Sequence, residues 1–362
     1  MTGRGIDQVL PHPGDPTLHE PYCHSALDYV QLAERLNGPI PRPVAFPYIW
    51  GRTIDDIRRL KPDAKLINLE TAVTVSDDFD REKDIHYRMS PQNVDCLTAA
   101  SIDCCSLANN HVLDWGQAGL LDTVDTLSRK GIAAIGAGRN FDEATSPAKR
   151  ALPSGGRVLF FACGCRSSGI LDHWAATASR PGVWLLDELA PSSVNTLTVK
   201  IRSAKRQGDL VVLSIHWGDN WGYDVPREQQ QFAHDAIDRA GVDLVHGHSS
   251  HHVKGIEVYQ GRLILYGCGD LLTDYEGIRG REDFRDDLGL LYFATLDPAS
   301  DSLVRLDMVP TLLNRFRLTA PSPTDVRWLA GVLDREGVPL GTSVELRDNQ
   351  LCLRWHKSMA PS

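Results

Sequence analysis

Four short stretches of the sequence place histidine, asparagine or acidic side chains directly after a run of apolar residues. They are LINLET (66–71), LANNHVLDWG (107–116), LSIHWGDN (213–220) and LVHGHSSHH (244–252). Neutral imidazoles are good ligands for zinc, iron and manganese, and carboxylate or amide oxygens complement them for harder ions. A two-metal hydrolytic centre needs such a mixed set, because one carboxylate bridges ions that lie about 3.5–4 Å apart. The four stretches therefore predict a hydrolytic metal site, provided that the fold brings them together.

Each stretch also has a purely structural interpretation. Glu70 could cap a helix or turn, and the asparagines of 107–116 could bond their own backbone in a turn. A lone histidine such as His216 is more often a satisfied core residue than a ligand. The stretch 244–252 is different, because four histidines within seven residues are costly to bury without a cation or other partners. Function is favoured by the recurrence of polar groups rather than by any single stretch.

Composition limits the class of protein. The chain has 362 residues, of which 42% are hydrophobic and 23% charged, so it can bury a substantial core as one large α/β domain or two ordinary ones. A net charge of −9 makes nucleic acid an improbable partner. The sequence contains no run of 18 apolar residues, so no membrane-spanning helix is expected. The first ten residues lack the apolar core of a signal peptide. We interpret the eight cysteines as reduced core thiols and expect a cytoplasmic protein, with an upstream targeting segment left open.

The chain alternates between helical and extended patterns. Helices are expected over 25–37, 53–62, 90–100, 116–131, 192–208, 226–241 and 323–337. Strands are expected over 64–71, 102–111, 132–138, 157–164, 209–219, 242–252 and, as a pair, 255–272. This alternation predicts a layered α/β fold with helices covering the sheets. Ligands of such folds gather at the carboxyl ends of the strands, where the four polar stretches fall.

The motifs NLET, LANNHVLDWG, IHWGDN and GHSSHH, followed by GIEVYQGRLILYGCGD, resemble the bacterial capsule-synthesis CapA family. That family belongs to the calcineurin-like metallophosphatase superfamily. The resemblance covers roughly residues 1–295 and implies a four-layer α/β/β/α sandwich with a dinuclear metal centre. Residues 296–362 are expected to form a small β-rich C-terminal extension that packs on it.

The resemblance also assigns roles to individual residues. Glu70 corresponds to the bridging carboxylate, and Asn110, His216, His248 and His251 correspond to further metal ligands. The implied cofactors are two divalent ions, namely Mn, Fe or Zn.

Three further residues are catalytic candidates. His111 resembles the histidine that contacts substrate and stabilises or protonates the leaving group, and Asp114 is expected to orient it. Ser250 replaces the family's usual proline. Arg4 is expected near the site, where its guanidinium could hold phosphate or carboxylate.

The family normally opens with an apolar strand that ends in Gly-Asp-Val-Met-x-Gly-Arg. This sequence begins MTGRGIDQ, which resembles that motif entered at its methionine. Either the natural start lies upstream and supplies the strand and its aspartate, or the form is truncated and one metal position lacks a ligand. We favour the first, because loss of a central strand would expose sheet edges on both neighbours.

Three functions follow as hypotheses. The first is a metal-dependent hydrolase acting on a phosphoester or a related acyl or amide substrate. The alternative is a protein that synthesises or processes poly-γ-glutamate or another cell-envelope polymer, and the third is a non-catalytic ligand-binding protein. In each case the expected partner is a small molecule or polymer that carries phosphate or carboxylate groups, and the oligomeric state stays open.

Overall fold

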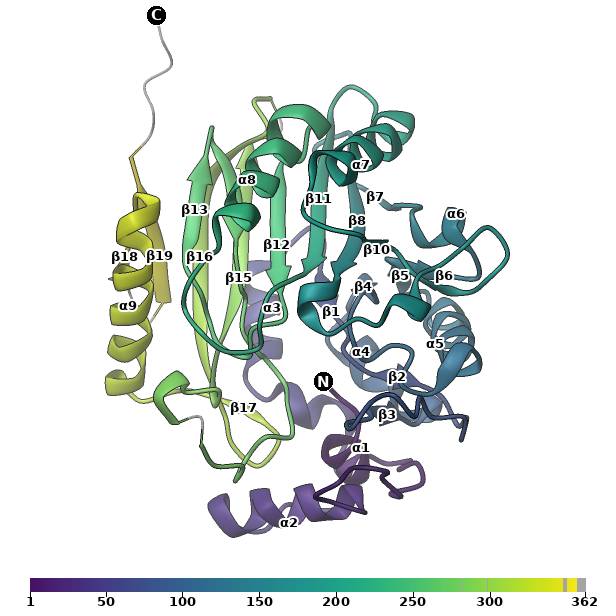
Figure 1. Cartoon of the computed structure of the whole chain (residues 1–362). Coiled ribbons are helices and arrows are strands. Elements are labelled where there is room, and N and C mark those ends of the chain that lie inside the picture. The colour runs from purple at the N-terminus through teal and green to yellow at the C-terminus, as the bar shows by residue number, and fades with distance from the viewer. Residues whose placement is uncertain (281, 298, 348–349, 357–362) are drawn as a thin grey trace, which may run out of the picture.

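The structure is a computed structural model that describes residues 1–280, 282–297, 299–347 and 350–356. Helices alternate with strands, so the predicted α/β class is confirmed (Figure 1). The helices are α1 (Gly5–Val9), α2 (Ala26–Asn37), α3 (Thr53–Leu60), α4 (Asp95–Ala99), α5 (Gly116–Arg129), α6 (Phe141–Ala144), α7 (Pro191–Ala204), α8 (Arg227–Asp235) and α9 (Pro323–Gly337).

Three sheets carry most of the strands. The three-stranded sheet is parallel, with the order β1 (Leu66–Asn68), β4 (Cys104–Ser106), β5 (Ala133–Ile135). The seven-stranded sheet has the order β10 (Leu185–Leu186), β8 (Arg157–Cys165), β11 (Asp209–His216), β12 (Leu244–His248), β14 (Arg262–Leu265), β13 (Ile256–Tyr259), with β7 (Ala148–Ala151) also on β8. The five-stranded sheet has the order β15 (Leu288–Asp297), β16 (Ser302–Leu313), β19 (Gln350–Trp355), β18 (Thr342–Arg347), with β17 (Leu318–Thr319) on β16.

Two small ladders complete the described strands. They are β2 (Ala72–Val73) with β3 (Arg88–Met89), and β6 (Ala137–Gly138) with β9 (Gly182–Val183).

The central strand β11 is buried along its whole length and is apolar from Leu210 to Leu213, as expected for a parallel strand covered on both faces. Apolar residues of α7 and α8 pack against one face of its sheet (Figure 1). The opposite face packs against β4 and β5. The register of β11 on β12 sets His216 opposite His248, so both strands present a histidine at the same edge. The expected clustering of these two strand ends is therefore confirmed.

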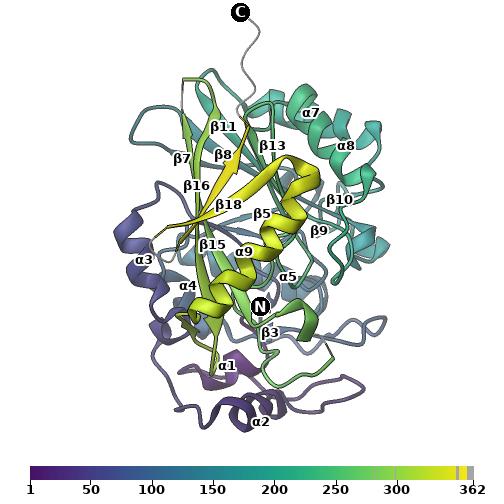
Figure 2. The ribbon, with the colours of Figure 1, turned by 90° about the vertical axis from the view of Figure 1, so that its left-hand side faces the viewer.

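The C-terminal part forms its own hydrophobic cluster. Helix α9 begins with a capping box, in which Ser322 and Asp325 each bond the other's backbone, and it matches the expected span 323–337. It crosses the five-stranded sheet in Figure 2 and packs against it through Val326, Leu329 and Leu333. The proposed division between residues 295 and 296 falls inside β15 and stays a prediction.

Element boundaries differ from the expected ones where polar residues interrupt a pattern. The span 90–100 is not one helix, because Pro91 opens a 3₁₀ turn that precedes α4. The strand expected over 102–111 ends at Ser106, and Asn109 and its neighbours form the following loop instead. Along the described part of the chain, no helix is long and apolar enough to cross a membrane.

Candidate functional site

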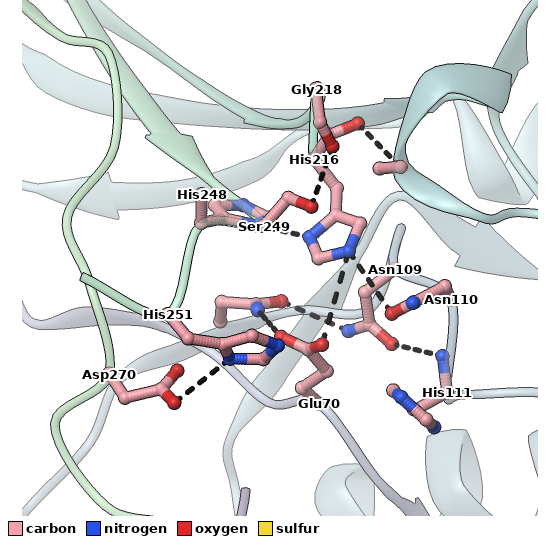
Figure 3. A network of polar contacts seen from close by, with 12 residues as sticks. Glu70, Asn109, Asn110, His111, His216, Gly218, His248, Ser249, His251 and Asp270 are labelled. Carbon is pink, nitrogen blue, oxygen red and sulfur yellow. Dashed lines mark hydrogen bonds and ion pairs between the residues drawn. The ribbon is translucent and has the colours of Figure 1, made fainter. Parts of the chain in front are cut away.

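Side chains from three separate strand ends converge on one point (Figure 3). His216 ends β11, Asn110 follows β4, and Glu70 follows β1. His216 Nε2 lies 3.1 Å from Asn110 Oδ1 and 4.0 Å from Glu70 Oε1. Glu70 and His216 thus share a site although they are 146 positions apart in the sequence. With Asn110, three predicted ligands are brought together.

The carboxylate of Glu70 is buried and oriented by amides. Asn68 Nδ2 donates to Glu70 Oε2 at 2.8 Å, and Asn109 Nδ2 donates to Asn68 Oδ1 at 3.0 Å. Asn109 Oδ1 in turn accepts from the backbone N–H of His111 at 3.1 Å. Burial raises the pKa of Glu70, and nearby His251 opposes that rise. The two neighbouring asparagines therefore have different roles. Asn109 stabilises the loop through its hydrogen bonds, and Asn110 faces the site.

A chain of hydrogen bonds runs through the histidines behind this point. His246 Nδ1 lies 2.9 Å from Ser214 Oγ, and Ser214 Oγ lies 2.8 Å from His248 Nε2. His248 Nδ1 lies 2.7 Å from His216 Nδ1. Burial lowers the pKa of His216 and His248, so both rings are neutral near pH 7.

Neutral rings give this chain a single direction. The amide oxygen of Asn110 can only accept, so His216 must carry its proton on Nε2. His216 Nδ1 then accepts from His248 Nδ1–H, and His248 Nε2 accepts from the hydroxyl of Ser214. If a cation replaced the proton on His216 Nε2, the donor and acceptor of each hydrogen bond from His216 through His248 to Ser214 would exchange roles, and every bond would be kept. The arrangement is therefore compatible with a proton or a cation at the same position.

His251 lies on the other side of Glu70 in Figure 3. Its Nδ1 is 2.9 Å from Asp270 Oδ2. Burial lowers the pKa of His251, but the charge and hydrogen bond of Asp270 outweigh that effect, and the net shift is upward. His251 thus differs from the other site histidines, because it is the one that the surroundings favour in its charged form. The loop before it holds Ser249 at a φ of 123°, a strained value for a residue with a side chain.

A second cluster surrounds the predicted catalytic histidine. His111 Nδ1 is 2.7 Å from Asp114 Oδ2, and this contact holds the ring in one orientation, whereas the catalytic role of the pair stays a prediction. Lys83 Nζ is 2.6 Å from Asp114 Oδ1 and 3.2 Å from His111 Nδ1. Burial and the charge of Lys83 lower the pKa of His111. The neutral ring keeps a free lone pair on Nε2, which suits accepting a proton better than donating one.

The predicted substrate contact Arg4 is engaged inside the protein. Its guanidinium donates to Asp274 at 2.6 and 3.0 Å, to Glu20 at 2.9 Å and to Tyr29 at 3.0 Å. It also lies over the rings of Tyr29 and Tyr87. Arg4 is 3% exposed, so its observed contacts are structural, and a contact with substrate stays a prediction.

Sequence reasoning missed Lys83 and Ser214 as parts of the site. Lys83 lies in the acidic loop 76–84, where it and Arg81 are the two cations among five acidic residues, and this pattern alone does not distinguish Lys83 from its neighbour. Ser214 faces the site because it lies two positions before His216 on the same strand and therefore on the same face. Asp270, which follows the last apolar strand before residue 272, also belongs to the site, because it pairs directly with His251.

The donor set suits a divalent cation in its chemistry, since a neutral imidazole, an amide oxygen and a carboxylate face one point. Among the described residues, no three His, Cys, Asp or Glu side chains are already spaced to hold an ion. His248 presents both nitrogens to protein groups, and His251 lies on the far side of Glu70. The metal assignments and the pair of ions therefore stay predictions.

Comparison with known proteins supplies the family. The family described as bacterial capsule synthesis protein PGA_cap matches residues 1–275. A probable polyglutamine synthesis accessory protein of Mycobacterium tuberculosis is 46% identical over 352 residues, which are 97% of this chain and 92% of that protein. The PGA biosynthesis protein CapA of Bacillus subtilis is 28% identical over 220 residues, which are 59% of this chain and 54% of its own. The resemblance seen in the motifs is thereby confirmed, and the chain belongs to the PGA_cap family of bacterial capsule synthesis proteins.

Proposed function

We propose that the protein is an accessory factor in the synthesis of a glutamate polymer of the bacterial envelope, and that its polar site binds a carboxylate-bearing substrate. The observation that carries this proposal is the likeness to the mycobacterial accessory protein over almost the whole chain. The site adds chemical support. Its donor set of a neutral imidazole, an amide oxygen and a carboxylate suits a divalent cation, and such a cation would supply the local positive charge that a protein with a net charge of −9 needs to hold an anionic chain.

The experiment is a deletion in the source bacterium, with envelope glutamate polymer measured after acid hydrolysis. We expect the deletion to lower the polymer and the wild-type chain to restore it. Complementation with Glu70→Gln tests the site, and Glu143→Gln on the exposed helix α6 is the matched control. An unchanged amount of polymer in the deletion strain would refute the proposal. Full restoration by Glu70→Gln would show that the protein acts in polymer synthesis without using this site.

A metal-dependent hydrolase is the second candidate, favoured by the convergence of Glu70, Asn110 and His216 beside the His111–Asp114 pair. Divalent ions, namely Mn, Fe or Zn, would polarise a phosphoryl or acyl oxygen and supply hydroxide near neutral pH. Within the protein, Asp114 fixes the tautomer of His111, and the free Nε2 accepts a proton from the reacting group. Glu70 and Asn110 are the residues that would hold such an ion, together with His216.

Turnover of an aryl phosphate by chelator-treated protein, before and after addition of Mn²⁺, tests this candidate. We expect activity only after the addition, and its loss in Asn110→Ala. Metal binding without turnover of aryl phosphate or glutamate polymer would favour the third reading, a ligand-binding protein. The four-layer α/β/β/α arrangement of the sheets belongs to the same proposal, and the packing of β11 on β4 and β5 supports its inner layers.

A further inference from the structure

Two tyrosines, Tyr87 and Tyr275, lie one in each half of the polar site, and we call them the tyrosine pair. The ring of Tyr87 meets the ring of His111 edge-on, with 4.5 Å between the ring centroids. The ring of Tyr275 packs in the same way against His251, at 5.2 Å. Figure 3 shows His111 and His251 on opposite sides of Glu70. The tyrosine pair therefore accompanies the two histidines that flank the predicted bridging carboxylate.

The hydroxyls of the tyrosine pair interact with each other and have hydrogen-bonding capacity left over. Tyr87 is only 1% exposed, and among the described residues its hydroxyl has no hydrogen-bond partner of normal geometry. Burying a hydroxyl without a full hydrogen bond costs free energy, and native proteins rarely leave one in that state. Tyr275 is partly exposed, so a ligand that approaches the pair meets Tyr275 first.

The guanidinium of Arg4 holds both tyrosines in place. It lies over the ring of Tyr87, 4.1 Å from the ring centroid. It also donates to Asp274, the residue before Tyr275, at 2.6 and 3.0 Å. The backbone N–H of Tyr87 donates to Asp114 at 2.7 Å, which fixes this tyrosine beside the His111–Asp114 pair. Because the hydroxyls are already ordered, a ligand that bonds to them loses little affinity to the cost of ordering side chains.

Both phenols are hydrogen-bond donors near neutral pH. Burial raises the pKa of each phenol above its usual value, and the charge of Arg4 opposes the rise without cancelling it. The buried hydroxyl of Tyr87 can satisfy its proton by donating to the oxygen of Tyr275. The proton of Tyr275 is then left to point into the site, where Glu70 and Asp270 lie within electrostatic reach. The tyrosine pair thus offers one donor to a ligand.

We propose that Tyr275 is a substrate-contacting residue whose hydroxyl donates to a carboxylate oxygen of a glutamate unit bound at the candidate site, and that Tyr87 positions Tyr275 through the contact of their hydroxyls. The inference rests on the proposed function, since it takes a glutamate chain as the ligand. A hydrogen bond from a phenol to a carboxylate is charge-assisted and therefore stronger than one to a neutral amide. Donation from Tyr87 to Tyr275 would strengthen it further, because hydrogen bonds in a chain polarise one another.

Calorimetric titration of a γ-linked glutamate oligomer into the protein, in the presence of Mn²⁺, tests the proposal. Tyr275→Phe keeps the ring against His251 and removes only the hydroxyl, so its Kd should rise roughly tenfold while the midpoint of urea unfolding stays unchanged. Tyr87→Phe should raise the Kd by less, and the double variant should bind as Tyr275→Phe does, because Tyr87 acts through Tyr275. Tyr259→Phe is the matched control and should bind as the wild type does. Its hydroxyl donates to Asp238, at the opposite end of the seven-stranded sheet from the site.

An oligomer whose carboxylates are methyl esters separates the two kinds of acceptor in a glutamate chain. It keeps the amide carbonyls, so the difference in Kd between the wild type and Tyr275→Phe should disappear. A difference of the same size with the ester would overturn the contact with a carboxylate. Equal affinity of the wild type and Tyr275→Phe for the free oligomer would overturn the inference and leave the proposed function standing. A wild type that does not bind the free oligomer would overturn both.

Discussion

His111 and Asp114 lie three residues apart and form a 2.7 Å contact between Nδ1 and Oδ2, with the carboxylate completely buried. The other oxygen of Asp114 accepts from Lys83 at 2.6 Å, and the backbone N–H of Tyr87 donates to the first at 2.7 Å. Burial raises the pKa of Asp114 to about 6, and the charge of Lys83 opposes the rise. Lys83 therefore keeps the aspartate charged, and the charged aspartate fixes the tautomer of His111.

Asp114→Asn should destabilise the fold by about 3 kcal/mol, because it leaves the Lys83 ammonium without its anionic partner in a largely buried place. The midpoint of urea unfolding measures this change. Asp95→Asn is the matched control, since it breaks a more exposed pair with Lys130 and should cost under about 1 kcal/mol. The double variant Asp114→Asn with Lys83→Met should recover part of the loss. Equal urea midpoints for Asp114→Asn and Asp95→Asn would contradict a stabilising interaction between Asp114 and Lys83.

Asn110→Ala should weaken Mn²⁺ binding by roughly tenfold or more, because it removes the amide oxygen that faces His216 and Glu70. Titration calorimetry on chelator-treated protein measures the affinity. Asn195→Ala, on the exposed side of α7, is the control and should bind as the wild type does. Equal affinity in both variants would remove Asn110 from the set of ligands.

Part of the site could be predicted from sequence because parallel strands end at one edge. The apolar run before His216 and the one before His248 mark two such strands, and their neighbouring ends follow from the fold class. Glu70 and Asn110 could be placed by the same rule.

The remainder depends on contacts that no local pattern encodes. Arg4 meets Asp274 across 270 positions, and neither residue lies in a periodic segment that would predict the other. Lys83 reaches Asp114 from an irregular loop, where the path of the chain is set by tertiary packing.

Stability should fall below pH 6.5, partly because of His246. Burial lowers the pKa of its imidazole from 6.5 to about 4. Between these pH values the unfolded chain binds a proton at His246 and the folded chain does not, so protonation favours unfolding. The folded state therefore has its full stability above pH 6.5 and loses stability as the pH falls toward 4. Between pH 7 and pH 5 the loss from this residue is about 2 kcal/mol.

The check is urea unfolding of the wild type and His246→Asn at both pH values. The variant should show a smaller drop between pH 7 and pH 5, whatever its absolute stability. His234→Asn is the control, because that ring is partly exposed and stacks on Tyr259. An identical drop in the wild type and His246→Asn would show that protonation of His246 does not account for the loss of stability.

Arg4→Met separates a structural role for this residue from the predicted contact with substrate. The side chains of Asp274 and Glu20 are fully buried around the guanidinium, so removing it leaves two carboxylates without their cation. We expect a loss of about 3–5 kcal/mol in the free energy of unfolding, a large fraction of the total for a typical domain. Arg4→Lys should recover only part, because an ammonium cannot reproduce the paired bonds to Asp274. A variant that unfolds as the wild type does but no longer binds phosphate or glutamate would instead assign Arg4 to the substrate.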